Sequence, residues 1–107
     1  MHISETDRLK IVEWAKNHAV IKRVYLYGSR ARGDHRPDSD IDLGIEVTTE
    51  DKTEAMLDWW DWHNKYEEAP DLHLEHSVQL EWYHPDADLE LVGTGVERDG
   101  ILLFDRI

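Results

Sequence analysis

The sequence predicts a small α/β (α+β) fold in which helices pack on a β-sheet. Segments with apolar residues at helical spacing alternate with short β-branched or aromatic segments, and turns rich in glycine, proline and acidic residues separate them. The chain has 107 residues, a length typical of one domain, so we expect residues 1–107 to form a single domain. A hydrophobic content of 40% is enough for one modest core.

The first half of the chain predicts one helix and two strands. Ser4 is a typical helix N-cap, and Leu9, Val12 and Ala15 follow at helical spacing. The β-branched and aromatic segment that comes next stops abruptly at Gly28, as expected of a strand followed by a turn. The predicted elements are a helix over about 5–18, a strand over 20–27, a short helical turn over 29–32, a loop over 34–39 and a strand over 40–47.

The second half predicts two helices and two strands. These are a helix capped by 48–51 with an apolar stripe of Met56, Trp59, His63 and Tyr66, an alternating segment over 72–76, a clearer strand over 78–83, a helix covering Leu89, Val92 and Val96, and a strand over 101–104. Ala55 and Trp62 flank the stripe, whereas Leu57 and Trp60 fall off it. An exposed Trp60 would indicate a partner surface or a rim contact with the last strand. Asp86 is a candidate N-cap of the last helix.

Charge and composition exclude several classes of function. A formal net charge of −12 argues against direct nucleic-acid binding, which requires a basic face. It favours a small anionic substrate held by local arginines and a metal ion, or a basic protein partner. The absence of cysteine excludes disulfides and thiolate-bound zinc. No apolar run reaches the roughly 18 residues of a membrane span, and the N-terminus has no signal-like segment, so we expect a cytoplasmic protein without membrane contact.

The two aspartates of the second strand suggest a metal site. Asp40 and Asp42 are two residues apart, so their side chains project to one face of a strand, opposite Ile41 and Leu43. Mg²⁺ prefers oxygen ligands and often shares them with the phosphates of a substrate. Paired carboxylates at one strand end therefore predict a magnesium site.

The turn between the two strands suggests a phosphate site. Gly28 and Ser29 stand at a predicted helix start, where glycine lets backbone N–H groups approach a bulky anion. Ser29 could alternatively be a plain helix cap. A phosphate turn beside a carboxylate pair indicates nucleotide chemistry.

The same residues resemble a known signature. Gly28-Ser29, a ten-residue gap and Asp40-Ile41-Asp42 are similar to the signature of the DNA polymerase β-like nucleotidyltransferase superfamily. Residues 28–33 and 38–43 resemble its minimal prokaryotic branch, the MNT domains. Residues 83–87 and 96–103 are less specifically similar to the C-terminal half of such domains. The resemblance spans most of the chain, but about twenty residues carry it.

The resemblance implies a mixed β-sheet of nucleotidyltransferase type. It implies transfer of a nucleoside monophosphate, AMP if the substrate is ATP, to an acceptor hydroxyl with release of pyrophosphate. Gly28, Ser29, Arg30 and Ser39 would bind the nucleotide, and Asp40 and Asp42 would be catalytic residues that ligate one or two Mg²⁺ ions. Members of the minimal branch commonly act as antitoxins beside a helical HEPN-type partner, which some of them modify at a hydroxyl. A homodimer could also complete the acceptor pocket.

Basic residues near this turn are further candidates. Arg30, Arg32 and Arg36 could neutralise the departing pyrophosphate. They could equally form surface salt bridges with nearby acids such as Asp34.

One expected residue is missing. The family usually has a third carboxylate on a later strand, and here its place falls on Gln79, which carries no charge and cannot act as a base. Glu81, two residues on and on the same face, could replace it as a catalytic acid. Asp71 or Glu75 would be the alternatives if 72–76 were the strand.

Three functions are therefore compatible with the sequence. The first is an active nucleotidyltransferase with a protein acceptor. The second is a non-catalytic member that binds nucleotide or partner, as Gln79 suggests. The third, transfer to a small molecule such as an aminoglycoside, ranks last because the chain lacks the large helical domain that holds such acceptors.

Overall fold

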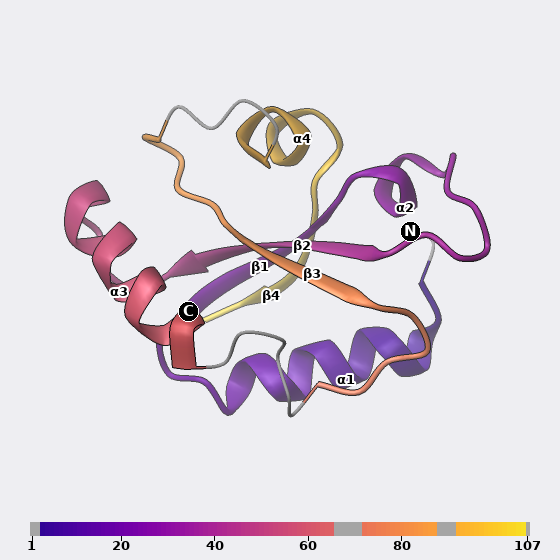
Figure 1. Cartoon of the computed structure of the whole chain (residues 1–107), viewed down its shortest axis with the longest axis horizontal. Coiled ribbons are helices and arrows are strands. Elements are labelled where there is room, and N and C mark those ends of the chain that lie inside the picture. The colour runs from indigo at the N-terminus through magenta and orange to yellow at the C-terminus, as the bar shows by residue number, and fades with distance from the viewer. Residues whose placement is uncertain (1–2, 66–71, 88–91, 107) are drawn as a thin grey trace.

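The computed structural model describes residues 3–65, 72–87 and 92–106 (Figure 1). Its elements are α1 (Glu5–Lys16), β1 (Ile21–Tyr27), α2 (Ser29–Arg32), β2 (Ile41–Val47), α3 (Lys52–Lys65), β3 (Val78–Trp82), α4 (Val92–Asp99) and β4 (Ile101–Asp105). The predicted order of helices and strands is confirmed, including the single helical turn after Gly28. Among the described helices, none combines the length and apolar character needed to cross a membrane.

The N-terminal caps of two helices follow the sequence. The Ser4 hydroxyl accepts a hydrogen bond from the Asp7 N–H at 3.0 Å, and the Asp51 carboxylate accepts one from the Glu54 N–H at 3.0 Å. These oxygens satisfy N–H groups that have no partner inside the helix. Helices α1 and α3 therefore begin where the sequence predicts.

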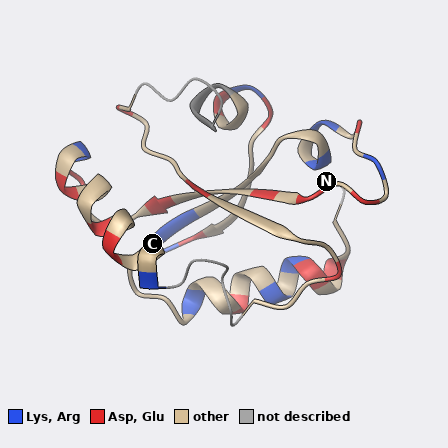
Figure 2. Ribbon diagram, viewed as in Figure 1, with Lys and Arg blue, Asp and Glu red and all other residues tan. Residues whose placement is uncertain are grey.

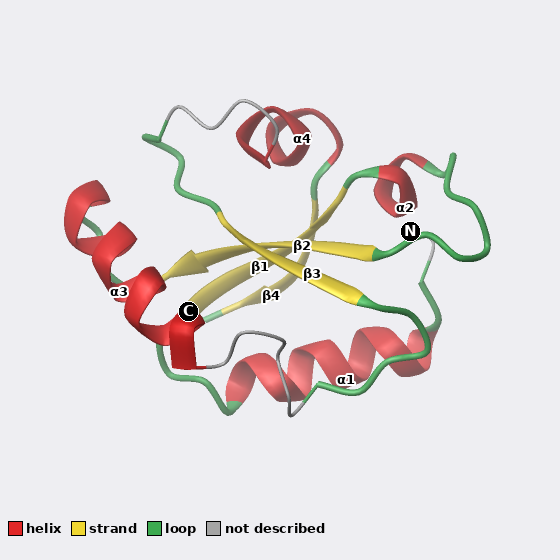
Figure 3. Cartoon of the chain, viewed as in Figure 1, coloured by secondary structure: helices red, strands yellow, loops and turns green. Residues whose placement is uncertain are grey.

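The four strands form a mixed sheet in the order β3-β2-β1-β4 (Figure 3). Strand β1 is antiparallel to β2 and β4, whereas β2 and β3 are parallel. This confirms the α+β class with a mixed sheet. Strand β2 has a partner on both sides, so residues on it have fixed neighbours in two directions.

The two faces of the sheet differ in character. Helices α1 and α3 lie on one side of the sheet, and α2 and α4 lie on the other (Figure 1). The side of α1 and α3 holds the apolar core, which includes the fully buried Leu26, Leu43 and Ile45. Since side chains alternate along a strand, the intervening residues of β1, β2 and β3 face α4. These intervening residues are polar, aromatic or glycine.

Helix α3 is rotated relative to the predicted stripe. Its buried residues are Ala55, Trp59 and Trp62, whereas Met56 is 38% exposed. Trp62 packs against α1, where its ring centroid is 6.0 Å from that of Trp14. Because α3 packs toward α1, the stripe through Met56 is wrong, and the flanking residues Ala55 and Trp62 belong to the core. Tyr66, the last stripe residue, lies outside the described residues.

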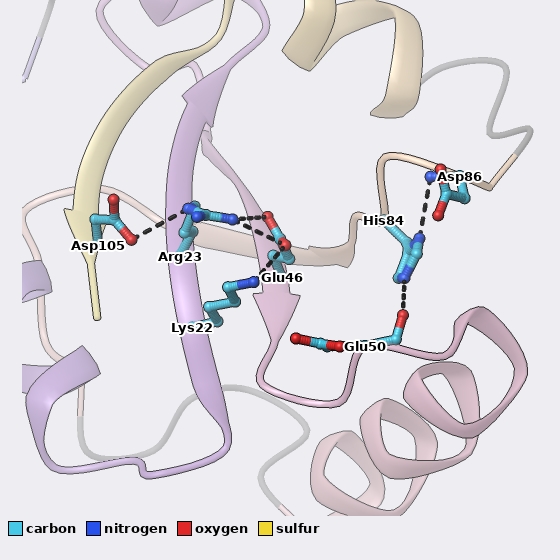
Figure 4. A network of polar contacts seen from close by, with 7 residues as sticks. All are labelled: Lys22, Arg23, Glu46, Glu50, His84, Asp86 and Asp105. Atoms are coloured by element: carbon cyan, nitrogen blue, oxygen red, sulfur yellow. Dashed lines mark hydrogen bonds and ion pairs between the residues drawn. The ribbon is translucent and has the colours of Figure 1, made fainter. Parts of the chain in front are cut away.

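His84 connects two segments by hydrogen bonds at the end of the sheet where β2 and β3 finish (Figure 4). The His84 Nδ1 accepts a hydrogen bond from the Asp86 N–H at 3.0 Å, so Nε2 carries the proton and donates to the Glu50 carbonyl at 2.9 Å. The buried ring thus joins the segment after β3 to the segment before α3. Asp86 lies in this turn, and Ala87 directly after it is a bend and not the first residue of a helix, so the prediction that Asp86 caps the helix is wrong. Leu89 lies outside the described residues.

A buried carboxylate links three strands (Figure 4). Glu46 on β2 is paired with Arg23 on β1 at 3.1 Å and with Lys22 at 3.8 Å. Arg23 also pairs with Asp105 on β4 at 3.1 Å. A buried charge requires such partners, so this network fixes the relative positions of β1, β2 and β4.

Candidate functional site

Three neighbouring strands bring polar side chains together on the face below α4. Tyr27 on β1 is the ladder partner of Asp42 on β2, and Asp42 is the ladder partner of Gln79 on β3. Residues paired in a ladder project to the same face, so these three side chains form a row across the sheet. Glu81 lies two residues beyond Gln79 on the same face, beside Gly44.

Gly28 allows Asp42 to lie against the turn. The φ angle of Gly28 is +76°, in the region that favours glycine. A Cβ atom added there would lie 2.5 Å from Asp42 Oδ2. Only glycine therefore fits at this position, and it brings the main chain of the turn into contact with the carboxylate. The Gly28 carbonyl then accepts hydrogen bonds from the N–H groups of Ala31 and Arg32, which start α2.

The side chain of Arg30 holds the loop that precedes β2. Arg30 is only 5% exposed, and its Nε and Nη2 donate to the Ser39 carbonyl at 3.1 and 2.9 Å. Nη2 also reaches the Pro37 carbonyl at 3.4 Å. These bonds position the residue directly before Asp40. A contact between Arg30 and a nucleotide stays a prediction, while the hydrogen bonds assign the side chain a role in shaping the loop.

Ser39 and Ser29 lie at the two ends of this turn and loop. The Ser39 hydroxyl accepts a hydrogen bond from the Arg36 N–H at 2.8 Å, which closes the loop on itself. Ser29 is the first residue of α2 and is half-buried. The turn that contains Gly28 and Ser29 thus lies against Asp42, and Ser39 directly precedes Asp40; the roles of these residues toward a nucleotide stay predictions.

The carboxylates of the site repel one another. The pKa of Asp42 is raised above its ordinary value, first by burial and then by the charges of Asp40 and Glu81, while Arg32 opposes the shift. The pKa of Tyr27 is also raised, by burial and by the charges of Asp42 and Glu81. Tyr27 therefore stays protonated beside two carboxylates. The site carries an excess of negative charge that a cation would relieve.

Gln79 occupies the place expected for a third acid. Besides its pairing with Asp42, its Nε2 donates a hydrogen bond to Asp40 Oδ2 at 3.3 Å. Among the alternatives, Glu75 lies in the loop before β3, because 72–76 does not form a strand, and Asp71 lies outside the described residues. Within the described part of the chain, no group of three or more His, Asp or Glu side chains is arranged to hold a metal ion by itself.

The residues nevertheless fit a magnesium ion that arrives with phosphates. Mg²⁺ usually binds one or two carboxylates and completes its shell with water and phosphate oxygens. Asp42 lies against the Gly28 turn and Asp40 is two residues away, and the pKa of Asp42 is raised first by burial and then by the charges of Asp40 and Glu81. The donor set therefore suits a metal shared with a substrate, not a closed metal cage.

A groove runs along β3 next to the carboxylates. Its volume is about 630 Å³. Its lining includes Gln79 and Glu81 from β3, His73 and His76 from the preceding loop, and His63 from α3. A second molecule in this groove would contact Gln79 and Glu81.

The remaining basic residues differ in position. Arg32 lies close enough to Asp42 to oppose the rise in its pKa, and it also pairs with Asp34 at 3.2 Å. Arg36 is exposed on the loop. Tyr27 had not been predicted as a site residue. Its position directly before Gly28, on the predicted strand, is the signal that could have identified it, because the register that pairs it with Asp42 follows from the turn.

Comparison with protein families identifies one match. The family described as "Polymerase beta, Nucleotidyltransferase" matches residues 9–106. No match was found among curated proteins.

Solved structures share the fold at low sequence identity. A toxin–antitoxin crystallised with AMP-PNP has a TM-score of 0.58 and 21% identity, and the match covers 92% of this chain and 73% of that chain. A mutant of the toxin–antitoxin MntA-HpeT gives a TM-score of 0.58 at 19% identity with the same coverage. A protein from Sulfolobus solfataricus assigned as a nucleotidyltransferase gives 0.55 at 20% identity, covering 92% of this chain and 77% of that chain.

Proposed function

The chain belongs to the polymerase beta nucleotidyltransferase family, and on this basis we propose that it transfers a nucleoside monophosphate, AMP from ATP, to an acceptor hydroxyl. The observation that carries the proposal is the contact between the Gly28 turn and Asp42, with Asp40 two residues away. A phosphate-binding turn and a carboxylate pair must be adjacent for this reaction. The family membership alone does not require that adjacency in this chain.

Different residues of the site bind the triphosphate, bind the metal ion and position the loop. Gly28 and Ser29 present main-chain N–H groups to the triphosphate, and Arg32 adds positive charge near Asp42. Asp40 and Asp42 hold Mg²⁺, which neutralises charge on the reacting phosphate when it is bound. Arg30 and Ser39 keep the loop closed so that Asp40 stays near Asp42.

Glu81 is the proposed base toward the acceptor. A hydroxyl that attacks the α-phosphate must lose a proton, and the amide of Gln79 cannot accept it. Glu81 is exposed, lies on the face of Asp42 and lines the groove along β3. We therefore assign this groove to the acceptor.

The acceptor is proposed to be a protein. Two of the similar structures are toxin–antitoxin complexes, one of them with AMP-PNP. Together with the MNT resemblance, this supports an antitoxin role and a helical HEPN-type toxin as the partner whose hydroxyl is modified.

The first test is nucleotide transfer. The full chain is incubated with labelled ATP, Mg²⁺ and the protein encoded by the neighbouring gene. We expect label on the partner, a loss of at least about a hundredfold in Asp42→Asn, and little change in Glu13→Gln, a matched removal of charge on the exposed side of α1. Transfer that survives Asp42→Asn, or no transfer to this partner, would contradict the proposal.

A second function is favoured by Gln79. The Gln79 amide pairs with Asp42 in the sheet and donates a hydrogen bond to Asp40. With this amide in place of an acid, the chain would bind nucleotide and partner but would not transfer a nucleotide. Two substitutions distinguish these functions. A non-catalytic protein should gain transfer activity from Gln79→Asp. An active enzyme that uses Glu81 as its base should lose most of its activity in Glu81→Gln. The same transfer assay measures both variants.

A further inference from the structure

Helix α3 exposes a compact apolar surface. Five large apolar side chains are exposed among the described residues, and three of them, Met56, Leu57 and Trp60, are on α3. Leu57 and Trp60 are each 59% exposed, and Met56 is 38% exposed. We refer to these three residues as the α3 outer face. On a helix, Trp60 neighbours both Leu57 at i−3 and Met56 at i−4, so the three side chains form one surface.

The apolar residues of the α3 outer face are not needed for α3 to pack against the rest of the protein. The helix is anchored on its other side by Ala55, Trp59 and Trp62, which are buried in the core. A polar residue at position 57 or 60 would therefore leave the fold unchanged. Leu9 and Leu102, the other exposed apolar residues, lie on α1 and β4. A tryptophan next to a leucine and a methionine on a rigid helix is the composition of a protein-binding surface.

Acidic residues border the α3 outer face. Glu54, Asp58 and Asp61 are exposed on the same helix, and Figure 2 shows the acidic residues along α3. Asp58 and Asp61 also line a cavity of about 390 Å³ between α3 and the turn from α1 to β1. Lys65 and His18 also line this cavity, and the Thr49 hydroxyl donates a hydrogen bond to the Asp58 carboxylate. The exposed carboxylates of Glu54 and Asp61 are therefore the acidic border that favours lysine or arginine on a partner.

We propose that the α3 outer face binds a partner protein through a helix whose apolar residues are flanked by lysine and arginine. The apolar residues contact Met56, Leu57 and Trp60, and the basic side chains pair with the exposed carboxylates of Glu54 and Asp61 that border this face. A second copy of this chain does not fit, because it would bring the same acids and a net charge of −12 to the interface.

The position of α3 separates this surface from the carboxylate site. Helix α3 follows the end of β2 at Val47, whereas Asp40 and Asp42 lie at its start, and Figure 1 shows α2 and α3 at opposite ends of the sheet. A partner bound to α3 therefore leaves the carboxylates open. The inference goes beyond the proposed function, because it holds whether or not nucleotide is transferred.

The test uses the full chain and two synthetic amphipathic helices. Both peptides carry leucines on one face; one has lysines on its flanks and the other has glutamates. Binding is followed by titration calorimetry and by the indole N–H signals of the tryptophans in NMR spectra. We expect the lysine peptide to bind and to shift the Trp60 signal, which Trp60→Gln identifies by its loss.

Matched variants distinguish specific binding at the α3 outer face from nonspecific hydrophobic binding. Trp60→Gln and Leu57→Gln should each weaken binding about tenfold, and Asp61→Asn about threefold. Leu9→Gln, which removes an equally exposed leucine from α1, should have no effect. Asp42→Asn should also bind the peptide normally, so a failure of nucleotide transfer and a failure of this surface remain distinguishable.

Several outcomes would overturn the proposal. These are no binding of the lysine peptide, equal binding of the glutamate peptide, or an equal loss in Leu9→Gln. A dimer in sedimentation that Trp60→Gln dissociates would assign the surface to a second copy and would also overturn it. Because two exposed positions are changed independently and NMR spectra report the fold, misfolding of one variant cannot produce the expected pattern.

Discussion

At the scale of single residues, the contact between Gly28 and Asp42 determines the geometry of the site. The main chain of the turn approaches the carboxylate so closely that a Cβ at position 28 would lie 2.5 Å from Oδ2. The glycine of the turn and the carboxylate of Asp42 are therefore positioned by one another. This explains physically why a glycine precedes Ser29 in this chain.

Substitution of Gly28 by alanine should disturb both stability and function. The positive φ of +76° and the overlap with Asp42 should cost about 1–3 kcal/mol of stability. Asp42 should also be displaced, which should abolish binding of ATP with Mg²⁺, measured by calorimetry. Gly33→Ala is the control, because Gly33 also has a positive φ, +92°, but is exposed at the end of α2. If both variants lost nucleotide binding equally, backbone strain alone would explain the effect.

The ionisation of Asp42 should lower stability at neutral pH. Folding raises the pKa of Asp42 by burial and by the charges of Asp40 and Glu81. The neutral Asp42 carboxyl favours the folded state. This contribution is complete at pH values below the pKa of Asp42 in the unfolded chain, about 3.9, and is lost as the pH rises through its higher pKa in the folded chain. In EDTA at pH 7, Asp42→Asn should therefore raise the free energy of unfolding, by about 0.5 kcal/mol.

Denaturant unfolding at several pH values measures this effect. The advantage of Asp42→Asn should shrink as the pH falls from 7 toward 4, because the wild-type carboxyl becomes neutral. Magnesium with nucleotide should reverse the order by stabilising only the wild-type protein. A variant less stable than wild type at pH 7 in EDTA would show that the carboxylates do not repel one another.

At the scale of elements, α4 covers the polar face of the sheet through two glycines. A Cβ added to Gly95 would lie 2.9 Å from Tyr27 Cδ2, and a Cβ added to Gly44 would lie 3.1 Å from Val96 Cγ2. The helix and β2 approach closely because neither glycine has a side chain. As Tyr27 lies between α4 and Asp42, the helix supports the edge of the carboxylate row.

Gly95→Ala distinguishes two effects on stability, the gain expected from helix propensity and the loss expected from the close packing of α4 on the sheet. Propensity alone predicts a gain of about 1 kcal/mol for Gly→Ala within a helix. The contact with Tyr27 predicts a net loss of about 1–2 kcal/mol, because the ring on β1 cannot move freely. Thermal unfolding should give this loss in the wild-type background and a smaller one in Tyr27→Leu, which removes the ring. A stabilised Gly95→Ala would show that α4 can shift away from the sheet.

At the scale of the whole molecule, the local elements were predictable and their relative positions were not. Caps, turns and alternation located the element ends that lie within the described residues to within about two residues. The strand order depends on pairing between distant segments, such as Val24 with Phe104, which no local pattern contains. The phase of α3 was wrong for a similar reason, since the α1 side chains that receive Trp62 lie far away in the sequence.

The site was predictable where one short stretch contains it. Residues 28–42 place the turn and the carboxylate pair in a single strand-turn-strand unit, so their adjacency follows from the sequence. The burial of Arg30 against the Ser39 carbonyl was not visible, because an arginine near a phosphate turn has the same sequence signature in either role. The pairing of Gln79 with Asp42 depends on the register of β3 against β2, which no local sequence pattern contains.

The order of the strands along the chain also affects how the protein is made. Strands β1, β2 and β3 contain Tyr27, Asp42, Gln79 and Glu81, and Asp40 directly precedes β2, so all of these residues are synthesised before α4 and β4. A nascent or shortened chain that ends after β3 thus has every acid of the site, yet one edge of β1 faces solvent where β4 should pair. An unpaired edge recruits strands from other molecules. Such a fragment would be prone to aggregate, so proteolytic loss of α4 and β4 would remove the protein from solution although every acid of the site is retained.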